Sequence, residues 1–284
     1  MSFRNEAVEA ARTAGGSFKT IAARSGMMRQ LADYLQKQNI QIRHISDLKE
    51  KHIAGWIKFG KDGGLKDRSL QNRLTAVRSV LRKIGLTKRV EGLQTEKFGI
   101  AGASRNGTRT GIGIESYQAK LANVDDKGVR AALQLQRVLG LRQREAVMAR
   151  IDTLQRWDRE LKEGGKIRIL EGTKGGRPRD TLVIDRLEAV DAVRFALDVA
   201  GERHGHLIES RGLKEAIDRF NNVARGAGFV GKESPHSLRY AWARDSIKRY
   251  ELHGLNRREA LICTSLDLGH GDGRGRWVEQ VYAR

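Results

Sequence analysis

The sequence has a single cysteine, Cys263, among 284 residues, and only two prolines, Pro178 and Pro235. One cysteine excludes an internal disulfide bond and fits a reducing compartment. The lack of proline in the first half favours a mostly helical chain, because proline interrupts helices. No apolar run is long enough to cross a membrane, and the first residues lack the apolar segment of a secretory signal. We therefore expect a cytoplasmic protein without a membrane partner.

Acidic side chains are scarce relative to basic ones, 34 against 54, which leaves a formal net charge of +20. Residues 1–120 hold 23 basic and 10 acidic side chains, whereas residues 121–284 hold 31 and 24. This excess predicts a polyanionic partner, with nucleic acid ahead of an anionic membrane surface. Aromatic residues make up only 6%, which disfavours an RNA-binding module that stacks bases on aromatic rings.

The first part of the chain predicts a small helical bundle with a basic exterior. Apolar residues recur at helical spacing over 21–38, 47–59 and 69–84. The stretch 93–116 is rich in Gly, Ser and Thr and has no sustained period, so we expect a linker there. We therefore predict a DNA-binding domain over residues 1–115, linker included, and a second domain over 117–284. The predicted DNA contacts here are Arg68, Arg73, Arg82 and Lys83.

In the second part of the chain, the spacing of apolar residues changes once from helical to strand-like. Lys166–Leu170 and Thr181–Ile184 alternate like strands, and the segment between them is typical of a hairpin loop. Helical spacing surrounds this hairpin, with predicted helices over 129–139, 142–149, 187–200, 213–227 and 235–250. The expected fold class is mainly α with a small antiparallel β-sheet (α+β).

Four short motifs in this part carry chemistry. Ser234-Pro235 is a good helix start. His236 and Arg239 then share one face near free backbone N–H groups, an arrangement suited to a phosphodiester. Taken alone, a surface histidine and a solvated arginine explain this pair better.

The other three motifs also have ordinary explanations when each is taken alone. Arg142 and Glu145 could present a guanidinium to a phosphate, or could form a simple intrahelical ion pair. Lys174, at the tip of the hairpin with Arg177 and Arg179 beside it, could reach a bound substrate or could belong to a solvated basic turn. The last motif is Gly-His at 269–270 followed by Tyr282, and a tyrosine near a chain end is usually packed or disordered.

Together these motifs have a meaning that none has singly. Their order along the chain, GLRQREA, a hairpin lysine, PHSLRY, LGH and VYAR, resembles the catalytic signature of the tyrosine recombinases, the phage-type integrases. The basic bundle before the linker resembles the family's core DNA-binding domain, so the resemblance covers roughly residues 20–284. The resemblance implies site-specific DNA cleavage and rejoining through a 3′-phosphotyrosine intermediate. The implied catalytic residues are Arg142, Lys174, His236, Arg239, His270 and Tyr282, with Glu145 in support and Arg177 and Arg179 among the DNA contacts.

The chain departs from common family members in two spacings. Arg239 and His270 are 31 residues apart, and His270 and Tyr282 are 12 apart, both longer than usual. We expect the first extra length to form a longer interhelical loop at 250–259. The second, GDGRGRW, is expected to form a mobile glycine-rich turn before the tyrosine helix. The chain also ends two residues after Tyr282, whereas many members continue with a tail that docks on a neighbouring subunit.

The implied partner is double-stranded DNA, and the resemblance implies a homotetramer on paired sites, with accessory DNA-bending or directionality proteins. The expected setting is integration or excision of a bacterial mobile element or phage. No metal-ligand cluster and no phosphate-binding loop for ATP stands out, so we expect no metal and no cofactor. Two other functions stay open. One is DNA relaxation like that of type IB topoisomerases, and the other is a non-catalytic architectural DNA-binding protein on the same fold.

Overall fold

The computed structural model describes residues 2–101 and 110–283, except for the side chain of Lys174. The chain forms two compact units, Met1–Ser104 and Arg105–Arg284. Each unit has a hydrophobic core of its own. Within the described residues, no helix is both long enough and apolar enough to cross a membrane.

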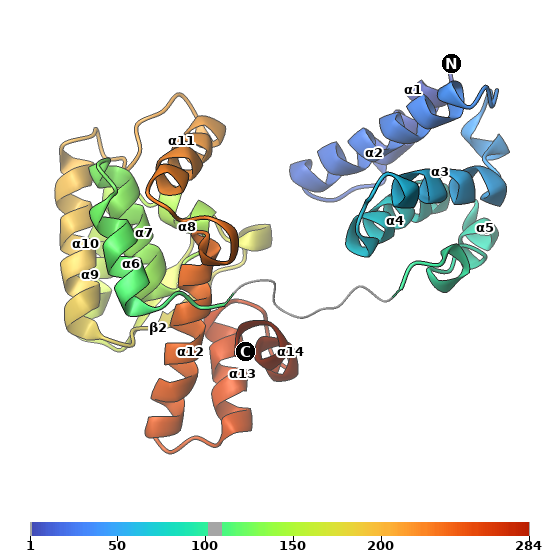
Figure 1. The fold of residues 1–284 in the computed structure, drawn as a ribbon. Coiled ribbons are helices and arrows are strands. Elements are labelled where there is room, and N and C mark those ends of the chain that lie inside the picture. Colours follow the sequence, from blue (N-terminus) through green and yellow to red (C-terminus); the bar gives the residue numbers. More distant parts are fainter. Residues whose placement is uncertain (1, 102–109, 284) are drawn as a thin grey trace. The chain divides into compact units, whose positions relative to one another are not determined.

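The first unit is a bundle of helices around α4 (Figure 1). Helix α4 packs against the other four because Leu70, Leu74, Val77 and Leu81 form a continuous buried stripe along it. The three helices predicted from periodicity are confirmed within a few residues. Helix α1 was not predicted, because its buried face is mostly alanine, which gives a weak apolar period. The helices are α1 (Phe3–Thr13), α2 (Phe18–Lys37), α3 (Glu50–Asp62), α4 (Asp67–Lys83) and α5 (Thr87–Glu91).

Both ends of the stretch expected to be a linker are packed rather than free. Leu93 and Ile100 lie in the core of the first unit. Ile112 lies in the core of the second, and the carbonyl of Gly111 accepts a hydrogen bond of 3.0 Å from Arg244. Residues 102–109 of this stretch lie outside the described residues. The predicted linker was therefore too long, because its scattered apolar residues are core residues despite their lack of period.

The second unit begins with a group of helices and contains one short antiparallel hairpin (Figure 1). Strands β1 and β2 pair with Lys166 opposite Leu182 and Ile169 opposite Arg179, so the predicted sheet is confirmed. Helix α10 packs against α7 and α9, and α9 also covers β1. Helix α9 was not predicted, although Leu154, Trp157 and Leu161 form its buried stripe. The elements are α6 (Ile114–Ala122), α7 (Lys127–Leu139), α8 (Gln143–Val147), α9 (Ile151–Glu163), β1 (Lys166–Ile169), β2 (Arg179–Leu182), α10 (Arg186–Gly201) and α11 (Leu213–Gly226).

Three further helices, α12 (His236–Leu252), α13 (Arg257–Asp267) and α14 (Gly275–Tyr282), complete the second unit. They share a small core in which Trp242, Leu268 and Val278 are fully buried. The expected long loop at 250–259 is wrong: α12 runs to Leu252 and α13 starts at Arg257, so only residues 253–256 lie between the two helices. This hairpin of helices is visible below the other helices of the unit in Figure 1.

Candidate active site

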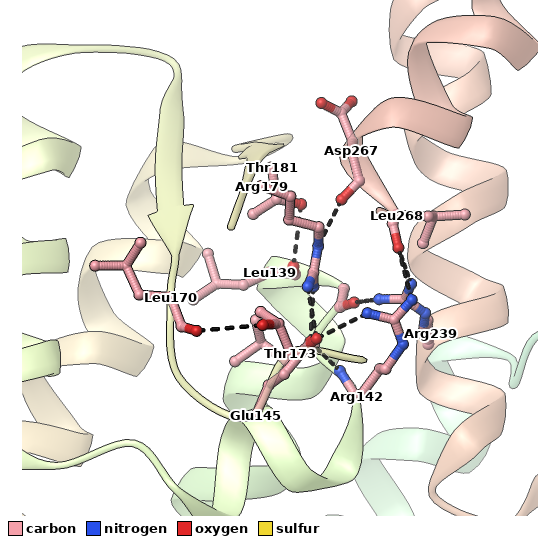
Figure 2. Close-up of polar contacts among 12 residues, drawn as sticks. Leu139, Arg142, Glu145, Leu170, Thr173, Arg179, Thr181, Arg239, Asp267 and Leu268 are labelled. Carbon is pink, nitrogen blue, oxygen red and sulfur yellow. Dashed lines mark hydrogen bonds and ion pairs between the residues drawn. The ribbon is translucent and has the colours of Figure 1, made fainter. Parts of the chain in front are cut away.

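The first motif folds into a buried ion-pair network at the start of α8. Glu145 is 1% exposed and accepts hydrogen bonds from the backbone N–H of Arg142 at 2.7 Å and from its Nη1 at 2.8 Å. The guanidinium of Arg179 donates to both Glu145 oxygens, at 2.5 and 2.7 Å (Figure 2). Burial by itself would raise the pKa of Glu145, but the Arg179 hydrogen bonds and the nearby guanidinium charges lower it to about 2. Glu145 is therefore an anion at neutral pH, and it lies between two arginines.

Arg239 lies three residues into α12 and is completely buried. Its Nη1 donates to the carbonyl of Gly140 and its Nη2 to the carbonyl of Leu268. Its Nε has no hydrogen-bond partner among the described residues. Burial, with the charges of Arg179 and Arg142, lowers the pKa of Arg239 to about 10, so it stays cationic at neutral pH.

Three arginines from separate motifs meet at the C-terminal end of α13. Nε of Arg179 donates to the carbonyl of Asp267 at 2.8 Å, and Nη2 of Arg142 donates to the carbonyl of Leu268 at 3.0 Å. Arg239 shares that second carbonyl, as Figure 2 shows. The last carbonyls of a helix carry partial negative charge, which suits guanidinium groups. The result is a concentrated positive centre held in place by backbone oxygens.

Tyr282 projects into this region from α14. Its hydroxyl lies 3.2 Å from Nε2 of His270, and its side chain is 3% exposed. Its ring packs against Tyr240 at a centroid distance of 4.5 Å and against Trp277 at 5.6 Å. Burial and the charges of Arg239 and Arg142 lower the pKa of His270 to about 3, so this imidazole is neutral. A neutral imidazole therefore holds the tyrosine hydroxyl next to the arginines.

The remaining predicted catalytic residues lie at the edges of this cluster. His236 starts α12, and its ring meets Tyr240 edge-on at 5.4 Å, so an aromatic chain links it to Tyr282. Lys174 starts a short 3₁₀ turn, Lys174–Gly176, at the tip of the β1–β2 hairpin. Its side chain lies outside the described residues. The fold thus brings together five of the predicted residues: Arg142, Glu145, Arg239, His270 and Tyr282. The ring of Tyr240 lies between His236 and Tyr282.

The predicted DNA contacts divide into exposed and inward-facing residues. Arg68, Arg82 and Lys83 on α4 and Arg177 in the hairpin are exposed. Arg73 instead packs over the ring of Trp56, 4.6 Å from its centroid, and donates to the Trp56 carbonyl at 3.3 Å. This position does not support a DNA contact, because the guanidinium already has a partner inside the bundle.

Arg179 also departs from the prediction. It is 7% exposed, and its Nε, Nη1 and Nη2 all donate to protein oxygens. The predicted phosphate contact is therefore corrected to an internal one. The sequence could not show this, because Glu145 lies 34 residues away along the chain.

Two aromatic residues of the site were not singled out from the sequence. Tyr240 follows Arg239 directly in the sequence, and its ring touches both His236 and Tyr282. Trp277 was placed in a mobile glycine-rich turn, but it lies inside α14 and its ring contacts His270 at 4.3 Å. The helical spacing of Trp277, Val278 and Val281 before Tyr282 would have indicated this helix.

The chain matches models of known protein families as well as solved structures. The family model "Integrase" matches residues 99–245, and the model "Phage integrase, N-terminal" matches residues 2–90. No curated protein matches the chain.

Solved structures share the fold over nearly the whole chain. The Tn1549 transposon integrase in complex with transposon right end DNA is 14% identical, with coverage of 98% of this chain and 94% of that one and a TM-score of 0.63. The XerH recombinase bound to its difH substrate is 17% identical, with coverage of 98% and 81% and a TM-score of 0.58. A λ integrase tetramer bound to a Holliday junction is 16% identical, with coverage of 95% and 76% and a TM-score of 0.60. The chain therefore belongs to the integrase family, and its fold is that of the tyrosine recombinases.

Proposed function

We propose that this enzyme is a site-specific DNA recombinase that cuts and rejoins double-stranded DNA through a transient bond between Tyr282 and a 3′ phosphate. The observation that carries the proposal is the Tyr282 hydroxyl, 3.2 Å from a neutral His270 and beside the arginine cluster. A tyrosine is a competent covalent nucleophile. A centre of fixed positive charge is what phosphoryl transfer requires, since charge builds on the phosphate oxygens.

The arginines are the groups that would bind the scissile phosphate. Arg142 is 22% exposed at its side chain and has donors left over after its contacts with Glu145 and Leu268. Within the part of the chain that the structure describes, the buried Nε–H of Arg239 lacks an acceptor, which costs about 1–3 kcal/mol. A phosphate oxygen would satisfy it, and His270 would add a further hydrogen bond.

Proton transfers accompany the two bond changes. The Tyr282 oxygen bonds to phosphorus while the bond from phosphorus to the 5′ oxygen breaks. We assign His236 to proton transfer on the nucleophile side and Lys174 to protonation of the leaving 5′ oxygen. The 3′-phosphotyrosyl bond conserves the energy of the phosphodiester, so a 5′ hydroxyl from a second strand can reverse the step. That reversal on a new partner is recombination.

DNA binding is assigned to both units. The exposed Arg68, Arg82 and Lys83 of the first unit would contact phosphates, as would Arg177 of the hairpin. The solved relatives contain DNA, and one is a tetramer on a Holliday junction. We therefore propose a homotetramer on two DNA sites that integrates or excises a mobile element, with accessory proteins setting direction.

The test is covalent capture. The protein is incubated with nicked duplexes from the flanks of its own gene, in EDTA, and SDS-resistant protein–DNA adducts are counted. We expect an adduct from the wild type and none from Tyr282→Phe, which removes only the hydroxyl. Tyr117→Phe is the matched control, because Tyr117 is a buried tyrosine on α6 and is expected to keep wild-type adduct formation.

The other outcomes are equally informative. An adduct that persists in Tyr282→Phe would mean that another residue is the nucleophile. Tight DNA binding without any adduct, on several flanking sequences, would overturn the enzymatic proposal. Relaxation of a supercoiled plasmid without exchange between two sites would point to topoisomerase activity instead.

A further inference from the structure

All three guanidinium nitrogens of Arg179 donate hydrogen bonds to protein oxygens, yet the proposed function gives this residue no task. It lies at the start of β2, opposite Ile169 of β1, where the hairpin leaves its paired part. Its Nη1 and Nη2 donate hydrogen bonds to the carboxylate of Glu145 on α8, and its Nε donates to the carbonyl of Asp267 at the end of α13 (Figure 2). One guanidinium thus ties three separate motif segments together.

A second contact fastens the other arm of the same hairpin to α8. Gly172 has a left-handed backbone, with φ of +72°. A Cβ at this position would lie 2.9 Å from the carbonyl oxygen of Arg144 and 2.9 Å from the Cα of Glu145. Only glycine permits this approach, because the obstructing atoms are backbone and cannot move aside cheaply. The hairpin arms therefore touch α8 on both sides of the tip, at Gly172 and at Arg179.

The tip between these attachments is residues 173–178, and it contains Lys174. A loop fixed at both ends has far fewer conformations than a loop fixed only by its strands. A catalytic group needs to stay within a fraction of an ångström of its productive position, so such fixation changes rate more than binding.

We propose that Arg179 is a positioning residue for Lys174: with Gly172 it fixes the β1–β2 hairpin against α8, and this fixed loop carries the lysine that protonates the leaving 5′ oxygen. This inference rests on the proposed function. It assigns to Arg179 an effect on protonation of the leaving group, distinct from phosphate binding by Arg142 and Arg239.

The chemistry of the leaving group gives a direct way to see this effect. When the bond from phosphorus to the 5′ oxygen breaks, the oxygen must take a proton, and Lys174 supplies it. If sulfur replaces that bridging oxygen, the group leaves as a thiolate, because thiols have a pKa of about 8.5. No proton is then needed, so a fault in the position of Lys174 no longer slows cleavage.

The experiment compares single-turnover adduct formation on two nicked duplexes that differ only in the bridging atom, oxygen or sulfur. Arg179→Lys keeps the charge beside Glu145 but loses the two-pronged geometry. Gly172→Ala leaves every charge in place and displaces the hairpin. We expect both variants, and Lys174→Ala, to be about 100-fold slower on the oxygen substrate. On the sulfur substrate we expect all three to come within about 10-fold of the wild type.

Matched control variants distinguish a misplaced hairpin from a general loss of folding or of DNA binding. Arg168→Lys changes an arginine of the same hairpin whose side chain is 57% exposed. Gly254→Ala changes a glycine with a left-handed backbone, and a Cβ there would have no neighbouring atom within 4 Å. Both are expected to cleave like the wild type on both substrates. Arg142→Ala is expected to stay slow on sulfur, since its defect lies in holding the phosphate. Circular dichroism and DNA affinity are measured for every variant.

Each outcome decides something. If folded Arg179→Lys and Gly172→Ala stay as slow on sulfur as on oxygen, Arg179 does not act through Lys174 and the inference fails. Loss of DNA affinity in Arg179→Lys with normal folding would make it a DNA contact instead. If the wild type forms no adduct on either substrate, the proposed function itself fails, and this inference falls with it.

Discussion

Glu145 is the residue whose ionisation couples the site to the stability of the fold. Its folded pKa of about 2 lies below its ordinary value of 4.5. A carboxylate of this kind stabilises the protein above its unfolded pKa and loses that contribution as pH falls from 4.5 towards 2. The depression of the pKa corresponds to about 3 kcal/mol for this buried group.

We therefore predict that Glu145→Gln lowers the free energy of unfolding by about 3 kcal/mol at pH 7. The gap between wild type and variant should shrink as pH falls below 4.5, because the unfolded wild-type chain then binds a proton at Glu145 that the folded protein does not bind until about pH 2. Urea unfolding at several pH values between 7 and 3 measures this. A gap independent of pH would mean that the ion pairs with Arg142 and Arg179 do not depress the pKa.

His270 gives a second prediction at the residue scale. Burial and the arginine charges lower its pKa to about 3, so its ring stays neutral in the DNA-free protein. Because the folded pKa lies below the ordinary 6.5, protonation favours the unfolded state, and stability is lost as pH falls below 6.5. NMR of ¹⁵N-labelled histidine, assigned with His270→Asn, should show no change at this ring between pH 8 and pH 5. A midpoint near 6.5 would contradict the closed arginine cluster.

The C-terminal end of α13 is the element on which the site is assembled. Its last carbonyls, of Asp267 and Leu268, hold three arginines, and Gly269 follows directly. Gly269 has φ of +67°, and a Cβ there would lie 2.8 Å from Cδ of Arg179. The turn thus passes close to Arg179 directly before His270, whose backbone N–H donates to the carbonyl of Ser265 at 2.9 Å.

We predict that Gly269→Ala lowers the free energy of unfolding by about 1–3 kcal/mol more than Gly271→Ala. Both positions have a left-handed backbone, but no atom lies within 4 Å of a Cβ at Gly271. Both variants therefore carry the backbone strain of an alanine with positive φ. The difference between their free energies of unfolding measures only the collision of the new Cβ with Arg179. Equal unfolding midpoints for the two variants would show that the turn can move away from Arg179 at no cost.

At the scale of the whole molecule, the charge of +20 governs association with DNA. Binding should weaken steeply with salt, because each neutralised phosphate releases a counterion. Arg82→Ala removes an exposed charge from α4 and should reduce the slope of log affinity against log salt by about 1. Arg73→Ala should leave this slope unchanged and lower stability instead, since Arg73 packs on Trp56. Fluorescence anisotropy titrations at several salt concentrations distinguish the two, and equal slopes for both variants would contradict the assignment.

The sequence alone indicated the fold class, most helices, the hairpin and the family, because these depend on local features. Apolar spacing fixes which face of α4 is buried, whatever packs against it. Motif residues such as His236, Arg239 and Tyr282 are recognisable by type and order along the chain. Helix α1 was not predicted because its buried face is mostly alanine, which buries little area per residue. Helix α9 was not predicted either, although Leu154, Trp157 and Leu161 form an apolar stripe at helical spacing.

Only the tertiary structure decided which arginines face DNA and which face the interior. Arg177 and Arg179 are two residues apart in one basic loop, yet one is exposed and the other is buried against Glu145. An arginine is buried only where a fixed anion or carbonyl meets it, because the desolvation of its charge must be offset. Those partners, Glu145 and the carbonyl of Asp267, come from 34 and 88 residues away along the chain. A local sequence pattern cannot show partners that lie so far apart along the chain. The sequence therefore determined which reactive side chains are present, and the fold determined which arginines face the interior and which face solvent.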